Sequence, residues 1–175
     1  MQDILTCAMG LDVHRDIIVA CLVKGAVDAE PEAETRTFST LIPEMQKLRD
    51  WVIESECRNI AMESTGIYWQ PIYEMLESCF DGEISILVVN ARHMKNVPGR
   101  KTDMKDAQWI ATLLRAGLLK GSFIPDKAFR ELRHLTRYRK SVVHDITAQK
   151  NRIDKFLQSS GFRFTAFLSD TFGAS

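Results

Sequence analysis

The sequence predicts an α/β fold, in which a mixed sheet carries helices on its faces and a long helix follows. Short apolar segments alternate with segments of helical periodicity over residues 4–117. Residues 126–160 contain neither proline nor glycine. With 175 residues, of which 45% are hydrophobic, the chain suits one packed domain with an appendage. No apolar run approaches the roughly 20 residues that a membrane span needs.

The first expected elements are strands. The apolar stretch 4–13 ends in a polar turn, and the β-branched run 17–23 follows so closely that an antiparallel hairpin is expected. The alternating segment 35–40 is expected to pair next. The acidic segment 28–34 before it is expected to be a solvated loop.

Helices and strands then alternate. Elements are expected in the order helix, strand, helix, strand, helix over 41–56, 59–64, 67–80, 83–90 and 102–117. Thr102 is the expected N-cap of the last helix, and Asp103 lies in its first turn, where the helix dipole favours an anion. The complete order implies a mixed sheet with helices on its faces.

The segment 126–160 is expected to form one long helix. Its apolar residues recur at alternating spacings of three and four, with Arg139 and Gln149 as polar positions in the series. The apolar members are Leu132, Leu135, Val142, Ile146, Ile153 and Phe156. Such a helix either projects from the domain or pairs with another helix.

The net charge of zero hides a strong asymmetry. Residues 1–91 hold 6 Lys and Arg against 16 Asp and Glu, whereas residues 92–175 hold 17 against 7. This division favours a polyanion-binding surface built by the second half. The alternative is that the two halves pair with each other.

Four acidic residues stand where strands end or a helix begins. Asp12 ends the first expected strand, Glu63 ends the strand at 59–64, and Asp103 and Asp106 share a face of the following helix. Open α/β sheets place their ligands at such strand ends. Like charges in close proximity raise each other's pKa, and a hard divalent cation such as Mg²⁺ relieves that repulsion.

A second interpretation of the aspartates stays open, namely an ordinary helix start in which Asp106 pairs with Lys105 or Arg100. If the acids bind metal instead, Arg100, Lys101 and Lys105 are expected to contact a nucleic-acid phosphate. Phosphate contacts are also expected from the long helix, with a solvated charged face as the alternative. The residues concerned there are Arg133, Arg137, Arg139 and Lys140.

Three stretches, GLDVHRDIIVACL, AMESTGIYW and VVNARHMKNVPGRKTDMKDAQWIATLLRAGLL, carry a family resemblance. In this order they resemble the DEDD-type insertion-sequence transposases of the IS110 group, which includes the Piv-type DNA invertases. The resemblance implies a RuvC-like (ribonuclease-H-like) fold. It also implies that Asp12, Glu63, Asp103 and Asp106 form a tetrad that binds Mg²⁺ or Mn²⁺ for DNA cleavage and strand transfer. DNA, a guide RNA and a homodimer or tetramer are the implied partners, with no membrane.

The resemblance divides the chain into three parts. Residues 1–122 are expected to form the RuvC-like catalytic domain, 123–160 a basic helix for dimerisation and nucleic-acid binding, and 161–175 a tail. The family's second, serine-bearing domain has no counterpart here, so an N-terminal fragment acting in a prokaryotic cytoplasm is expected. Two alternatives are a stand-alone nuclease of the Holliday-junction-resolvase kind and a non-catalytic nucleic-acid-binding and assembly module.

Overall fold

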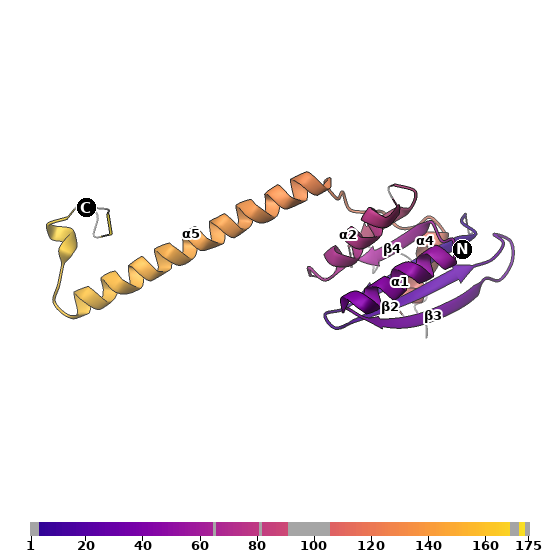
Figure 1. Cartoon of the computed structure of the whole chain (residues 1–175), viewed down its shortest axis with the longest axis horizontal. Helices are drawn as coiled ribbons and strands as arrows, with labels where there is room; N and C mark the ends of the chain where they lie inside the picture. The colour runs from indigo at the N-terminus through magenta and orange to yellow at the C-terminus, as the bar shows by residue number, and fades with distance from the viewer. Residues whose placement is uncertain (1–3, 65, 81, 91–105, 169–171, 174–175) are drawn as a thin grey trace. The chain divides into compact units, whose positions relative to one another are not determined.

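The chain divides into two compact units, Met1–Phe123 and Ile124–Ser175. The structure is a computed structural model, drawn in Figure 1. It describes residues 4–64, 66–80, 82–90, 106–168 and 172–173.

The first unit is built on a five-stranded sheet in the order β3-β2-β1-β4-β5. The strands are β1 (Cys7–Val13), β2 (Ile17–Lys24), β3 (Glu32–Ser39), β4 (Asn59–Glu63) and β5 (Ser85–Val89). The first three pair antiparallel, and β1, β4 and β5 run parallel. The described helices of this unit are α1 (Ile42–Glu54), α2 (Trp69–Phe80) and α4 (Asp106–Arg115). The predicted mixed α/β sheet with helices on its faces is confirmed.

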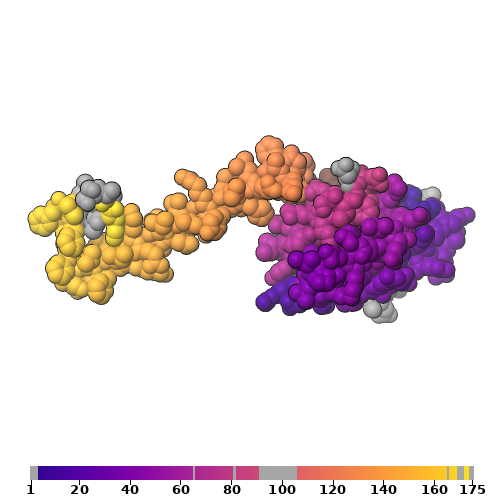
Figure 2. All heavy atoms as spheres, viewed as in Figure 1, coloured from indigo at the N-terminus to yellow at the C-terminus, as the bar shows by residue number. Residues whose placement is uncertain are grey.

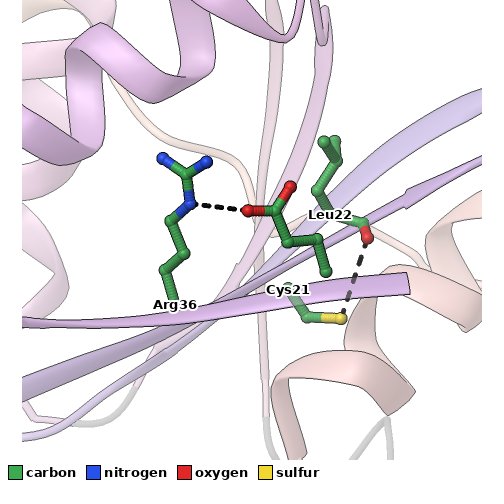
Figure 3. Close-up of polar contacts among 4 residues, drawn as sticks. Cys21, Leu22 and Arg36 are labelled. Carbon is green, nitrogen blue, oxygen red and sulfur yellow. Dashed lines mark hydrogen bonds and ion pairs between the residues drawn. The ribbon is translucent and has the colours of Figure 1, made fainter. Parts of the chain in front are cut away.

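The third strand begins earlier than the sequence suggested. Glu32 already pairs with Lys24 of β2, so part of the segment expected to be an acidic loop belongs to the strand. An edge strand keeps one side open to solvent and can therefore carry charge in place of an apolar alternation. Glu34 accepts a hydrogen bond of 2.7 Å from Arg36, shown in Figure 3. The guanidinium of Arg36 also lies 4.5 Å from the ring centre of Trp51, which ties β3 to α1.

Helices cover the sheet on both faces. Ala107 and Ala111 of α4 pack with Cys21 and Val23 on one face. A side chain at Gly10 would collide with the α4 backbone, so the helix lies directly on β1. On the other face, helix α1 contacts β3 through two aromatic rings, Phe38 and Trp51, whose centres are 6.1 Å apart.

The C-terminal end of α4 is fixed by a buried arginine. Arg115 donates hydrogen bonds to the carbonyl oxygens of Leu5, Gly25 and Ala26, at distances from 2.6 to 3.2 Å. Its own carbonyl accepts from the backbone amides of Ile4 and Leu5. The strand expected from residue 4 therefore begins only at Cys7, because the residues before it bond to the helix instead. Helix α4 runs antiparallel to β1, with its N-terminus at the carboxyl end of that strand.

The second unit contains the 33-residue helix α5 (Lys127–Ser159) and the short 3₁₀ helix η1 (Phe164–Ala166). Asp126 caps α5 by accepting a hydrogen bond of 3.0 Å from the amide of Phe129. Within the described chain, none of the helices is both long and apolar enough to cross a membrane. One line of residues, called the α5 stripe below, consists of Leu132, Leu135, Arg139, Val142, Ile146, Gln149, Ile153 and Phe156.

Candidate active site

Two of the predicted carboxylates lie at the ends of adjacent parallel strands. Strands β1 and β4 are in register at Leu11 and Met62, so Asp12 and Glu63 follow as the next residues of each strand. Neighbouring strands are roughly 5 Å apart. Because side chains alternate along a strand, Asp12 lies on the same face as Gly10, and that face is covered by α4. Glu63 shares this face through Ala61, which packs against Ile110.

Helix α4 brings a third carboxylate to the same edge. Its first residue is Asp106, which is exposed and directly precedes Ala107, the residue whose backbone lies against Gly10. Since α4 runs antiparallel to β1, its first turn lies at the carboxyl end of the strand. Asp12, Glu63 and Asp106 therefore belong to one edge of the sheet.

The side chain of Asp12 is largely enclosed, with 13% of it exposed. Its Oδ2 atom lies 3.2 Å from Nε2 of His14, whose side chain is 53% exposed. A protonated Nε2 donates to the carboxylate and fixes its orientation. The contact leaves one carboxylate oxygen for another partner.

The turn that carries His14 is held from two sides. The amide of His14 donates to the carbonyl oxygen of Ile17 at 2.9 Å, which closes the β1–β2 hairpin. Thr40 then binds the turn itself, through its hydroxyl to the carbonyl of Arg15 at 2.9 Å and through its amide to the carbonyl of Asp16 at 3.2 Å. Side chains on such anchored turns keep a defined position.

His14 is the site residue that the sequence interpretation did not assign. The available signal was its spacing, because a residue two positions after Asp12 lies on the same side of an extended chain. The structure adds that the two side chains touch.

Arg100, Lys101, Asp103 and Lys105 lie outside the described residues. Among the residues that the structure describes, no three His, Cys, Asp or Glu side chains are close enough together to hold a metal ion. The donor chemistry nevertheless fits a hard cation, because the acids at this edge offer only carboxylate oxygens, the ligands that Mg²⁺ and Mn²⁺ prefer.

The predicted basic contacts of the second unit are exposed on α5, but they occupy two different faces. At 100° per residue, Arg133, Arg137 and Lys140 lie opposite the α5 stripe, and we call them the outer face. Arg139 is a member of the stripe. In the space-filling view, side chains project along the length of α5 (Figure 2). The helix therefore combines a basic face with a mainly apolar one.

Two cysteine thiols form a separate cluster near the amino end of β1. A hydrogen bond with Cys57 lowers the pKa of Cys7 to about 7; the charges of Lys24 and Arg115 act in the same direction, and burial opposes them. The same hydrogen bond and burial raise the pKa of Cys57. Cys7 begins β1 and Asp12 lies near its other end, so the thiols are not part of the carboxylate edge.

A family model described as a transposase, DEDD_Tnp_IS110, matches residues 9–161. The chain belongs to this transposase family. The match covers all but the first two residues of the sheet, the carboxylate edge and all of α5. No curated protein matches the sequence.

Two solved structures can be compared with this transposase. Thermus thermophilus RuvC aligns with 12% identity and a TM-score of 0.46, over 66% of this chain and 99% of the other. Thermus thermophilus RuvC in complex with a Holliday junction substrate aligns with 12% identity and a TM-score of 0.47, over 67% and 100%. The fold assignment rests on the order and direction of the strands described above.

Proposed function

We propose that this transposase cleaves DNA and transfers strands at the carboxylate edge, with Mg²⁺ held by Asp12, Glu63, Asp103 and Asp106. The observation that carries the proposal is the position of Asp12 and Glu63, side by side at the ends of β1 and β4 on the face covered by α4. Asp106 lies at the same edge, and Asp103 precedes it by three residues in the sequence.

Each residue of the edge has a separate task in this proposal. Asp12 and Glu63 supply oxygen ligands from strands that the sheet holds in register, and His14 fixes the orientation of Asp12. A bound divalent cation supplies charge stabilisation at the scissile phosphate and at the leaving oxygen. The partly buried position of Asp12 limits competition from water for its carboxylate.

Basic residues in both parts of the chain would bind the nucleic acid. Arg100, Lys101 and Lys105 are close in sequence to the tetrad aspartates, and the outer face of α5 adds further cations. The excess of 17 Lys and Arg over 7 Asp and Glu in residues 92–175 supports a polyanionic partner, which includes DNA and a guide RNA. We assign residues 1–122 to catalysis and 123–160 to nucleic-acid binding and to assembly of a homodimer or tetramer.

The metal-site proposal is tested by changing one carboxylate and its matched neighbour. Asp12→Asn removes a charged ligand, whereas Asp16→Asn makes the same change in the hairpin turn, on a side chain that is 84% exposed. We expect Asp12→Asn to weaken Mn²⁺ binding by more than about 100-fold, beyond the 10–100-fold typical of groups that only orient a ligand. Calorimetric titration measures binding, and nicking of supercoiled plasmid with Mg²⁺ measures cleavage.

The control variant makes the outcome interpretable. Asp16→Asn should bind Mn²⁺ as the wild type does, within about twofold, because its carboxylate is solvated and is not one of the proposed ligands. Equal binding heats in the wild type and Asp12→Asn would exclude Asp12 as a ligand. Metal binding without DNA nicking would support the site and contradict autonomous cleavage by this chain.

A further inference from the structure

Two thiols meet at the amino ends of β1 and β4, which are the opposite ends of these strands from the carboxylate edge. Cys7 is the first residue of β1, and Cys57 lies in the connection between α1 and β4. Met9 lies opposite Ile60 in the parallel pair of strands. The same register places Cys7 opposite Arg58, one residue away from Cys57. Strands about 5 Å apart and a rise of about 3.3 Å per residue put the two Cα atoms roughly 6 Å apart, a separation that a disulfide spans.

The side chains of both cysteines lie on the face of the sheet that α1 covers. Ala8 packs with residues of α4, so its neighbour Cys7 faces the other side of the strand. The Nδ2 atom of Asn59 donates to the carbonyl oxygen of Cys7 at 3.3 Å, and the carbonyl oxygen of Asn59 accepts from Sγ of Cys57 at 3.3 Å. The two thiols are also hydrogen-bonded to each other. The start of β4 therefore holds the two sulfur atoms as a pair.

Two cations lie beside this pair. Lys24 of β2 is directly opposite Cys7, and its Nζ atom donates to the carbonyl oxygen of Ser55 at 3.5 Å. Arg115 donates to a carbonyl oxygen in the segment just before β1. Cys7 is half-buried, and Cys57 is 1% exposed and lines a hollow of about 420 Å³. Reactive cysteines typically occupy such electropositive and partly exposed surroundings.

The surroundings give the two thiols different protonation states. The hydrogen bond with Cys57 lowers the pKa of Cys7 to about 7, and the charges of Lys24 and Arg115 act in the same direction, against the effect of burial. A large fraction of Cys7 is therefore thiolate near neutral pH, and the thiolate is the nucleophilic form. The hydrogen bond with Cys7 and burial raise the pKa of Cys57, so this thiol keeps its proton. Cys7 is thus the thiol that reacts first, with Cys57 beside it as the second.

We propose that Cys7 and Cys57 form an oxidation site at which a hydroperoxide converts the two thiols into a disulfide. The Cys7 thiolate attacks the hydroperoxide and breaks its O–O bond, which leaves a sulfenic acid on Cys7 and releases an alkoxide that takes up a proton. The sulfur of Cys57 then attacks the sulfenic sulfur, the S–S bond forms, and the hydroxyl group leaves as water with the proton of Cys57. In total the two thiols lose two electrons and two protons, and the hydroperoxide is reduced to water and an alcohol. The site lies outside the proposed cleavage reaction and involves none of its metal ligands.

Peptide mapping after oxidation tests the site. The full chain carries Cys79→Ser, so that its exposed thiol cannot link two molecules, and is treated with hydrogen peroxide. Free thiols are then blocked with iodoacetamide in urea before digestion with trypsin. We expect the peptides 1–15 and 50–58 to be joined, to be lighter by two hydrogen atoms than their sum, and to separate when a thiol reductant is added. Recovery of both peptides unlinked, with their cysteines alkylated or oxidised singly, would overturn the proposal.

Two single variants assign the order in which the thiols react. In Cys57→Ser, oxidation should stop at the sulfenic acid of Cys7, which dimedone labels. Cys7→Ser should show no dimedone label on Cys57, and tryptophan fluorescence confirms that each variant is folded. A label on Cys57 in Cys7→Ser, or an unlabelled Cys7 in Cys57→Ser, would contradict the assigned order.

The effect of the cation opposite Cys7 can be measured in the same way. Lys24→Gln removes a charge that favours the thiolate, so we expect hydrogen peroxide to consume the Cys7 thiol roughly twofold to fivefold more slowly. Lys47→Gln is the matched control, because Lys47 is exposed on α1 and pairs with Glu44, and its rate should equal that of the wild type. Equal rates in the two variants would show that Lys24 does not activate Cys7.

Discussion

The two units of the chain differ in the exposure of their apolar side chains. In the first unit, side chains such as Leu11 and Ile60 are completely buried between the sheet and its helices. In the second, the apolar residues of the α5 stripe stay exposed. The first unit contains its own core, whereas the apolar residues of the α5 stripe lie on the surface of the second unit.

This difference decides how far each unit explains its own function. The carboxylate edge follows from strand register and from the packing of α4, which are properties of one chain. The apolar residues of the α5 stripe are exposed, although helices in proteins gain most of their stability from packing. The roles proposed for α5 therefore concern contacts with other molecules.

The largest expected effect is on the stability of the first unit, which should change while the second unit stays folded. Gly10→Ala places a methyl group where the backbone of α4 lies, and backbone atoms cannot move aside as a flexible side chain can. We expect the first unit to lose about 3 kcal/mol or more of its free energy of unfolding. All three tryptophans, Trp51, Trp69 and Trp109, belong to this unit, so their fluorescence during urea unfolding reports on it alone.

A matched control uses a glycine with more room. An added Cβ at Gly121 would lie 3.3 Å from the side chain of Leu87, which can shift slightly, so Gly121→Ala should cost under about 1 kcal/mol. Far-ultraviolet circular dichroism should show α5 still helical when Gly10→Ala has lost its tryptophan signal. A single transition shared by both probes would mean that the two units unfold together.

The sequence predicted the fold well where periodicity and burial agree. The apolar strands were found because a buried sheet selects β-branched and aliphatic residues, and α5 was found because no proline or glycine interrupts it. The start of β3 was missed, since Glu32 and Glu34 lie on an edge strand where solvent satisfies charged side chains. The local sequence does not indicate that this segment pairs with β2, and this pairing makes it a strand.

The site was also predictable in part, where it depends on the ends of strands. Strand ends identified Asp12 and Glu63 as neighbours, because parallel strands bring their carboxyl ends to one edge. The contact of His14 with Asp12 depends on the anchored hairpin turn, and Thr40, which anchors it, is 25 residues away from Arg15 in the sequence. Such tertiary hydrogen bonds leave no regular pattern in the chain.

An intermediate effect on nucleic-acid binding is expected when the basic residues on the outer face of α5 are replaced. Replacing Arg133, Arg137 and Lys140 together with Gln should reduce the salt dependence of binding to duplex DNA. Each lost phosphate contact lowers the slope of log K against log salt by about 0.9, so three contacts lower it by about 2.7. The change is measured by fluorescence anisotropy of a labelled duplex at salt concentrations from about 50 to 200 mM.

Arg139 supplies the contrast within the same helix. Arg139→Gln removes an equal charge from the stripe, and we expect the salt slope to stay near the wild-type value because the stripe lies on the side of α5 opposite the outer face. A slope reduced by about 0.9 in Arg139→Gln would assign this residue to nucleic acid after all.

The smallest effect concerns His14 and returns to the first unit. His14→Ala removes the hydrogen bond to Oδ2 of Asp12, so the carboxylate can rotate away from a position that suits a metal. We expect Mn²⁺ to bind roughly tenfold more weakly, the lower end for an orienting group, because His14 is half exposed and water can replace it in part. His14→Gln keeps a donor at this place and should recover most of the affinity. Unchanged affinity in His14→Ala, with the tryptophan unfolding curve also unchanged, would show that the sheet alone orients Asp12. The carboxylate edge would then depend only on strand register. The contrast with α5 would become sharper, because the first unit would form its site without an orienting side chain.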